Sequence, residues 1–114
     1  MISKALVAAS TKPILLSILL SGESYGYEII QKVKDLSGGG MDWADGMLYP
    51  VLHRLEKDGL IRSRWRVSEE VRMRKYYVLT ALGRKELEFE KNQWQSVHEV
   101  LSRLWDLRPA GEWE

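Results

Sequence analysis

The segment that decides the fold is residues 45–79, DGMLYPVLHRLEKDGLIRSRWRVSEEVRMRKYYVL, because the spacing of its apolar residues changes at Gly59. Before Gly59, apolar residues recur every three or four positions, which is the period of an amphipathic helix. After Gly59 they alternate with polar residues, which is the period of a β-strand. The segment therefore predicts a helix followed by a pair of strands.

The first half of this segment predicts a helix with one apolar and one polar face. Asp45 can cap its start, and Gly59 can end it. The apolar stripe consists of Leu48, Val51, Leu52 and Leu55. The outward face consists of Tyr49, His53, Arg54 and Lys57. We expect the stripe to be buried and the basic face to remain accessible.

The second half predicts a basic β-hairpin with Arg72 at its tip. Its first strand places Arg62, Arg64 and Arg66 on one face, opposite Ile61, Trp65 and Val67. In its second strand, Tyr77 and Leu79 are expected to face the core. Trp43 and Trp65 are also expected to be core residues.

Two helices are predicted upstream. In the first, Thr11 can act as cap with Pro13 in the first turn, or the helix begins near Ser3 and Pro13 kinks it; the sequence leaves both open. Ser24 can cap the second, whose apolar residues repeat at helical spacing until Ser37 and the glycines that follow it.

A long final helix is predicted from Thr80 onward. Leu87, Trp94, Val97, Leu101 and Leu104 follow a heptad-like spacing that Glu90 interrupts once, and Arg108-Pro-Ala-Gly closes the helix. We expect a mainly α fold with a small β-hairpin. Its parts are a winged helix-turn-helix over residues 1–80, a dimerisation helix packed on helix one over residues 81–108, and a tail over residues 109–114.

The composition favours one folded domain that is neither exported nor inserted in a membrane. The 114 residues are 45% apolar and 29% charged, enough to form one core under a polar surface. Cysteine is absent, and no run approaches the ~20 apolar residues that cross a bilayer, so we expect a cytoplasmic protein. The net charge is only +1, so any binding of nucleic acid must depend on the local cluster of basic residues from Arg62 to Lys75.

An enzyme is disfavoured, and no cofactor or metal is expected. The sequence holds no nucleophile motif, phosphate-binding loop or metal-ligand cluster, and its two histidines, His53 and His98, fall on separate predicted elements.

The order of the elements is instead that of a winged helix-turn-helix, in which a helix enters the ~12 Å major groove of duplex DNA and the hairpin reaches the flanking backbone. Base and phosphate contacts are expected from Tyr49, His53, Arg54 and Lys57 on the helix. Phosphate contacts are expected from Arg64, Arg72, Arg74 and Lys75 on the hairpin.

Several motifs closely resemble the PadR family of transcriptional regulators. They are GMLYPVLHRLEKDGLI from Gly46, then Trp65, then RMRKYYVLT from Arg72, with YGYEI from Tyr25 in helix two, and the resemblance spans residues 14–104. It implies a homodimeric repressor of a palindromic operator, and it adds Tyr25 and Met47 to the DNA-binding candidates. The family usually has Thr or Ser where this chain has Met47, and glycine where it has Val71.

The dimer is expected to form through the apolar faces of helix one and the final helix, at Leu15, Leu19, Trp94, Val97, Leu101 and Leu104. Family members that sense flat aromatic compounds use a tryptophan at the position of Trp94. The resemblance thus implies a small aromatic effector, held by Trp94 and His98 with Lys12 and Leu16. Trp94 as plain dimer core remains the alternative.

A protein-binding winged-helix adaptor without specific DNA binding is the alternative function. In that case the apolar final helix docks another protein, and the basic face has no role in binding.

Overall fold

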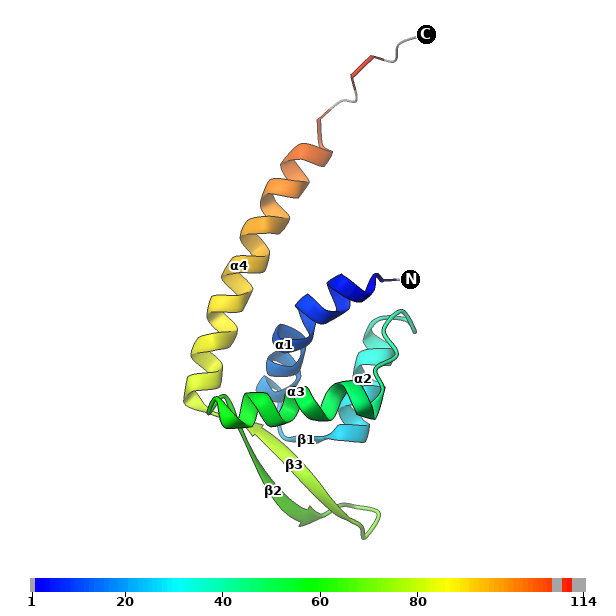
Figure 1. The fold of residues 1–114 in the computed structure, drawn as a ribbon, viewed down its shortest axis with the longest axis vertical. Helices are drawn as coiled ribbons and strands as arrows, with labels where there is room; N and C mark the ends of the chain where they lie inside the picture. Colours follow the sequence, from blue (N-terminus) through cyan, green and yellow to red (C-terminus); the bar gives the residue numbers. More distant parts are fainter. Residues whose placement is uncertain (1, 108–109, 112–114) are drawn as a thin grey trace.

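The computed structural model describes residues 2–107 and 110–111, and it has the mainly helical fold with a small antiparallel sheet that the sequence predicts (Figure 1). The elements are α1 (Lys4–Leu20), β1 (Ser24–Tyr25), α2 (Gly26–Leu36), α3 (Asp45–Lys57), β2 (Ile61–Val67), β3 (Met73–Leu79) and α4 (Ala81–Trp105). The three shorter helices form a body, from which the β2–β3 hairpin projects at one end and α4 at the other.

One hydrophobic core holds the body together. Its members include Leu15 and Leu16 of α1, Ile29 of α2, and Leu48 and Leu52 of α3, all fully buried. The predicted inward stripe of α3 is thereby confirmed, with Leu55 buried and Val51 packed against the same core. The burial of Leu15, Leu16 and Leu19 inside one chain corrects their expected places at the dimer interface and effector site.

The first helix begins at Lys4, so Pro13 lies inside it. Ser3 is the N-cap, and its hydroxyl oxygen accepts a hydrogen bond from the Leu6 amide at 3.2 Å. Thr11 is not a cap: it is buried in mid-helix and its hydroxyl donates to the Val7 carbonyl at 2.6 Å. Because proline has no N–H, Pro13 interrupts the helical hydrogen bonding at the middle of α1.

The expected caps of α2 and α3 are wrong. Ser24 lies in β1, and its hydroxyl donates to the Glu28 carboxylate at 2.5 Å, while Tyr25 occupies the cap position. Asp45 is already inside α3, and Ala44 precedes it. β1 itself escapes sequence analysis because two residues carry no periodic signal; it pairs with β3 to give the sheet order β1-β3-β2.

The hairpin is confirmed, but only its base packs on the core. Ile61 and Tyr77 are buried, whereas Trp65 is 63% exposed, so the expectation that Trp65 is a core residue is wrong. The two strands pair from Ile61–Leu79 out to Val67–Met73. The outer part of the hairpin therefore extends beyond the helical body. Arg72 lies in the connecting turn, as predicted, and Trp43 is buried.

The long final helix is confirmed, capped by the Thr80 hydroxyl oxygen, which accepts from the Gly83 amide at 3.0 Å. Leu87 is buried against the body, and Lys12 of α1 forms an ion pair with Glu86. α4 ends at Trp105, before the expected limit at residue 108. Arg108 and Pro109 of the expected closing segment 108–111, and tail residues 112–114, lie outside the described residues.

Candidate nucleic-acid interface

A hollow of about 370 Å³ lies where the start of α2, one flank of α3 and the hairpin meet. It brings together Tyr25, Tyr49, His53, Arg74 and Lys75, all of them predicted DNA-binding residues. The other five lining residues were not among the predicted DNA-binding residues: Gly26, Tyr27, Trp65, Met73 and Tyr77. The position of Trp65 between two arginines, on a strand that extends beyond the core, is the signal that could have identified it as a site residue. We call this hollow the wing-side hollow.

Close packing at Gly26 sets the position of Tyr49. A Cβ atom on Gly26 would lie 2.5 Å from the Tyr49 hydroxyl oxygen, well inside normal contact distance. Any larger residue at Gly26 would therefore push the Tyr49 side chain out of place. The ring of Tyr49 is nevertheless partly exposed, so it can both pack on α2 and meet a ligand.

Arginine and tyrosine side chains stack along one side of the sheet. The Arg74 guanidinium lies 4.3 Å from the centre of the Tyr25 ring, and the Arg66 guanidinium lies 4.4 Å from that of Tyr76. Tyr25 and Tyr76 meet edge to face, with ring centres 5.2 Å apart. These contacts hold two cations at defined places without neutralising them.

Two glutamates balance part of the basic charge. Glu23 accepts from Arg64 at 3.1 Å and from Arg66 at 2.6 Å, and Glu70 accepts from Arg74 at 2.9 Å. The hydrogen bond to Glu70 is the main reason that the pKa of Arg74 lies above its usual range. Each pair has one exposed partner, and solvent there weakens the attraction, so DNA phosphates can compete for these arginines.

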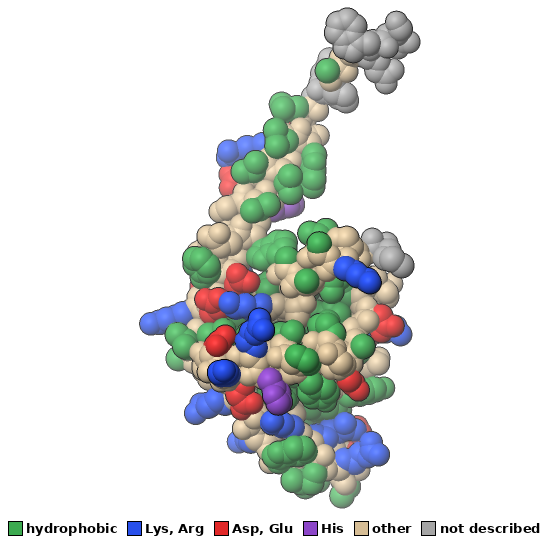
Figure 2. Space-filling model, viewed as in Figure 1, with side chains coloured by type: hydrophobic (Ala, Val, Ile, Leu, Met, Phe, Trp, Pro, Cys, Tyr) green, Lys and Arg blue, Asp and Glu red, His purple; other side chains and the backbone are tan. Residues whose placement is uncertain are grey.

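The remaining predicted basic residues lie in the open. Arg72 and Lys57 are exposed, and within residues 2–107 neither forms an ion pair. Figure 2 shows Lys and Arg side chains over the lower body and the hairpin, and apolar side chains along α4. Arg72 and Lys57 therefore face solvent, as phosphate-binding side chains must.

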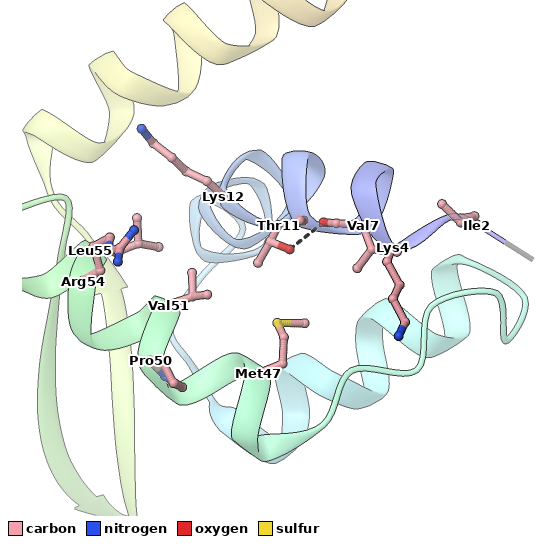
Figure 3. Close-up of a pocket in the computed structure, with 11 residues that line it drawn as sticks. Ile2, Lys4, Val7, Thr11, Lys12, Met47, Pro50, Val51, Arg54 and Leu55 are labelled. Atoms are coloured by element: carbon pink, nitrogen blue, oxygen red, sulfur yellow. Dashed lines mark hydrogen bonds between the residues drawn. The ribbon is translucent and has the colours of Figure 1, made fainter.

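Two predicted residues lie elsewhere. Met47 and Arg54 are on the opposite flank of α3, where they line a second cavity together with α1 (Figure 3). The helical period explains the split, because positions 49 and 53 share one flank of a helix while 47 and 54 share the other. The polar face predicted for α3 is therefore two surfaces rather than one.

The four expected effector residues are not brought together. Leu16 is buried, Lys12 pairs with Glu86, and Trp94 and His98 lie on the exposed part of α4. His98 Nε2 lies 3.3 Å from the Ser102 hydroxyl oxygen. In one chain, only Trp94 and His98 remain available as neighbours for an effector.

Burial under the wing-side hollow raises the pKa of the Tyr77 hydroxyl to about 12, with smaller contributions from Tyr49 and Glu56. Burial also raises the pKa of Tyr25. Both phenols therefore stay protonated at neutral pH and can donate a hydrogen bond.

The described part of the chain, residues 2–107 and 110–111, contains no group of His, Asp or Glu placed to hold a metal ion. Its helices are either too short or too polar to cross a membrane.

Known proteins are similar to this chain in both sequence and fold. Residues 15–89 match the transcriptional regulator PadR-like family. A PadR-like transcriptional regulator from Bacillus cereus has a TM-score of 0.83 and 28% identity, over 92% of this chain and 100% of that one. A transcriptional regulator from Clostridium thermocellum has a TM-score of 0.78 and 30% identity, over 88% and 97%.

A curated relative, the transcriptional regulator YqjI of Escherichia coli, is 33% identical over 86 residues. The match covers 75% of this chain and 40% of YqjI, so the chain spans less than half of that relative. The matched family consists of transcription regulators rather than enzymes. This chain therefore belongs to the PadR-like family of transcriptional regulators, as a DNA-binding protein with a winged-helix fold.

Proposed function

We propose that the protein is a repressor that binds a palindromic operator as a homodimer and is released by a small molecule. The observation that carries this proposal is the wing-side hollow, in which Tyr49 and His53 of α3 line one surface with Arg74 and Lys75 of the hairpin. A helix and a hairpin on one surface match the major groove and its flanking backbone.

The contacts divide by chemistry. Tyr49, His53 and Lys57 of α3 reach base edges and phosphates, while Arg64, Arg72, Arg74 and Lys75 of the hairpin bind phosphates, with Tyr25 supporting Arg74. Arg54 binds phosphates on the far side of the groove, and Met47 supplies only apolar contact. Each neutralised phosphate releases condensed cations, so affinity falls by about 0.9 log unit per log unit of salt for each contact.

The dimer forms along the distal part of α4. Trp94, Val97 and Leu104 are exposed there at heptad-like spacing, with Leu101 half-buried beside them. A second copy can cover this apolar seam, because the same residues then face one another across a two-fold axis and the surface is complementary to itself. That axis places two α3 helices and two hairpins on one side, as a palindrome requires.

The effector is a planar aromatic compound stacked on Trp94, with His98 one turn away as the polar contact. Trp94 is 38% exposed in the protomer, so part of this residue is available for contact. We expect Trp94→Ala to abolish saturable quenching of tryptophan fluorescence by such compounds. Equal affinity in that variant would exclude Trp94 from the site and leave it as dimer core.

The test of DNA binding is footprinting on the DNA upstream of the protein's own gene, followed by titration of the protected site. Tyr49→Ala and Arg54→Ala should each weaken binding about tenfold or more, equivalent to at least ~1.4 kcal/mol. Lys34→Ala is the control, since it removes a positive charge from the exposed end of α2, outside the wing-side hollow.

Two results would contradict the proposal. Unchanged operator affinity in both α3 variants would remove these residues from the interface. A purified protein that ignores the upstream DNA at low salt but forms a stoichiometric complex with another protein through α4 would establish the adaptor instead.

A further inference from the structure

A second cavity, of about 570 Å³, separates the N-terminal half of α1 from α3 (Figure 3). Val7 and Thr11 face it from α1, and Met47 and Val51 face it from α3. It lies on the flank of α3 opposite the wing-side hollow. The lining residues are Ile2, Lys4, Val7, Ala8, Thr11, Lys12, Met47, Pro50, Val51, Arg54 and Leu55.

The lining is apolar inside and basic at its edges. Lys4 and Arg54 lie towards opposite ends of the cavity in Figure 3, and Lys12 extends away from it towards α4, where it pairs with Glu86. Among the described residues that line the cavity, none is acidic. An uncompensated cation beside an apolar surface favours an anion that carries an apolar body.

The kind of apolar body follows from the side chains. The described lining contains aliphatic groups and the thioether of Met47 but no aromatic ring. A flat aromatic compound gains most from stacking on aromatic rings, which this cavity does not offer. A flexible hydrocarbon chain instead fills the irregular space between Val7, Met47 and Val51.

We propose that this cavity binds an aliphatic carboxylate of the fatty-acid class, with its tail between α1 and α3 and its carboxylate on Arg54. The guanidinium of Arg54 matches a carboxylate in a paired hydrogen-bond geometry. A volume of this size lies within the range of small-molecule sites. This site differs from the aromatic site proposed at Trp94 in place and in chemistry.

Occupancy should oppose DNA binding, an effect that rests on the proposed function. A carboxylate on Arg54 neutralises a charge that would otherwise meet a phosphate. The tail also presses on α3 from the α1 side, and α1 can yield at Pro13, where a helical hydrogen bond is missing. By linkage, the ligand weakens DNA binding by the same factor by which DNA weakens ligand binding.

The binding test is calorimetric titration of the full-length, DNA-free protein with decanoate, with decanol as the uncharged comparison. We expect saturable submillimolar binding of decanoate, at least tenfold tighter than decanol. Arg54→Gln should remove the preference for the charged ligand. Ala8→Phe should abolish binding by filling the cavity, whereas Ala5→Phe, on the same helix and outside the lining, should bind normally.

Three results would overturn the proposal: no saturable binding, equal binding of decanoate and decanol, or equal binding to Ala8→Phe. A change in oligomeric state in Ala8→Phe, without ligand binding in the parent protein, would show that a second copy occupies the cavity. Arg54→Gln keeps the headgroup assignment testable if Ala8→Phe does not fold.

Operator titration with decanoate separates this inference from the proposed function. Decanoate should weaken operator binding in the parent and in Ala5→Phe but not in Ala8→Phe. Failure to bind the operator without ligand would contradict the proposed function and leave the calorimetric result standing. Normal operator binding that decanoate does not change would remove the regulatory role.

Discussion

The two halves of α4 carry the same apolar pattern in different surroundings. Leu87, in the half next to the body, is 1% exposed, whereas Leu104, on the projecting half, is 56% exposed. The hairpin repeats the contrast, because Ile61 at its base is buried and Trp65 farther out is not. Near the body these side chains stabilise the protomer; farther out, the same residue types are available to a partner.

The largest effect should come from Gly83, where α4 joins the body. A Cβ atom there would overlap the Leu60 carbonyl oxygen and lie 2.6 Å from Leu79 Cδ1. Since the Leu60 backbone cannot move freely, Gly83→Ala should cost about 3 kcal/mol or more of unfolding free energy in chemical denaturation. Gly46→Ala, with nothing within 4 Å, should cost nothing. Equal stability of the two variants would show that α4 is not anchored at Gly83.

Leu87→Ala and Leu104→Ala make the same change in the two halves. Leu87→Ala should lower the unfolding free energy by about 2–5 kcal/mol at any protein concentration, because it leaves a cavity in the core. Leu104→Ala should leave the monomer's stability unchanged and raise the dissociation constant of the dimer, measured by analytical ultracentrifugation. A loss of monomer stability in Leu104→Ala would mean that the distal half packs on its own chain.

The burial of Tyr77 at the base of the hairpin should make the stability of the protein depend on pH in alkaline solution. The pKa of Tyr77 rises from its ordinary 10.0 to about 12 in the folded protein, so unfolding releases its proton in this range. The stabilisation is complete below pH 10 and is lost at about 1.4 kcal/mol per pH unit as the pH rises towards 12. Tyr77→Phe should remove this slope from the pH dependence of unfolding. A slope identical to that of the parent would place the titrating group elsewhere.

The outer hairpin should affect DNA binding and not stability. Arg72→Ala should weaken specific and nonspecific DNA alike, and should reduce the salt slope by about 0.9, because one phosphate contact is lost. Arg74→Ala should do the same and also release Tyr25 from its stacking contact. Fluorescence anisotropy at several salt concentrations measures both. A loss confined to the specific site would mean that the hairpin contacts bases.

The smallest effect should come from the hairpin turn. Val71 has a φ of 58°, a left-handed conformation that strains a β-branched residue by about 1–2 kcal/mol. Val71→Gly relieves this strain but makes the unfolded chain more flexible, so we expect a net gain of at most ~1 kcal/mol. A melting temperature below that of the parent would show that the Val71 side chain has a packing role.

The positions of much of the candidate interface could be predicted from the sequence. The alternation after Gly59 located the hairpin, and the helical period placed Tyr49 and His53 on an accessible face, as the structure has them. The pairing of Arg64 with Glu23 could not be predicted, since the two residues are 41 positions apart. The separation of Arg54 from Tyr49 follows from the helical period, but which element lies against each flank of α3 could not be predicted.

The sequence by itself determined the order of the elements, their periods and the family, because these depend on neighbouring residues along the chain. Only the tertiary structure decided how far the core extends: it buried Leu15 and Leu19 inside one chain and left Trp65 and Leu104 outside it. It also opened the cavity between α1 and α3. The physical reason is that burial depends on the distances between elements, and no local pattern encodes those distances.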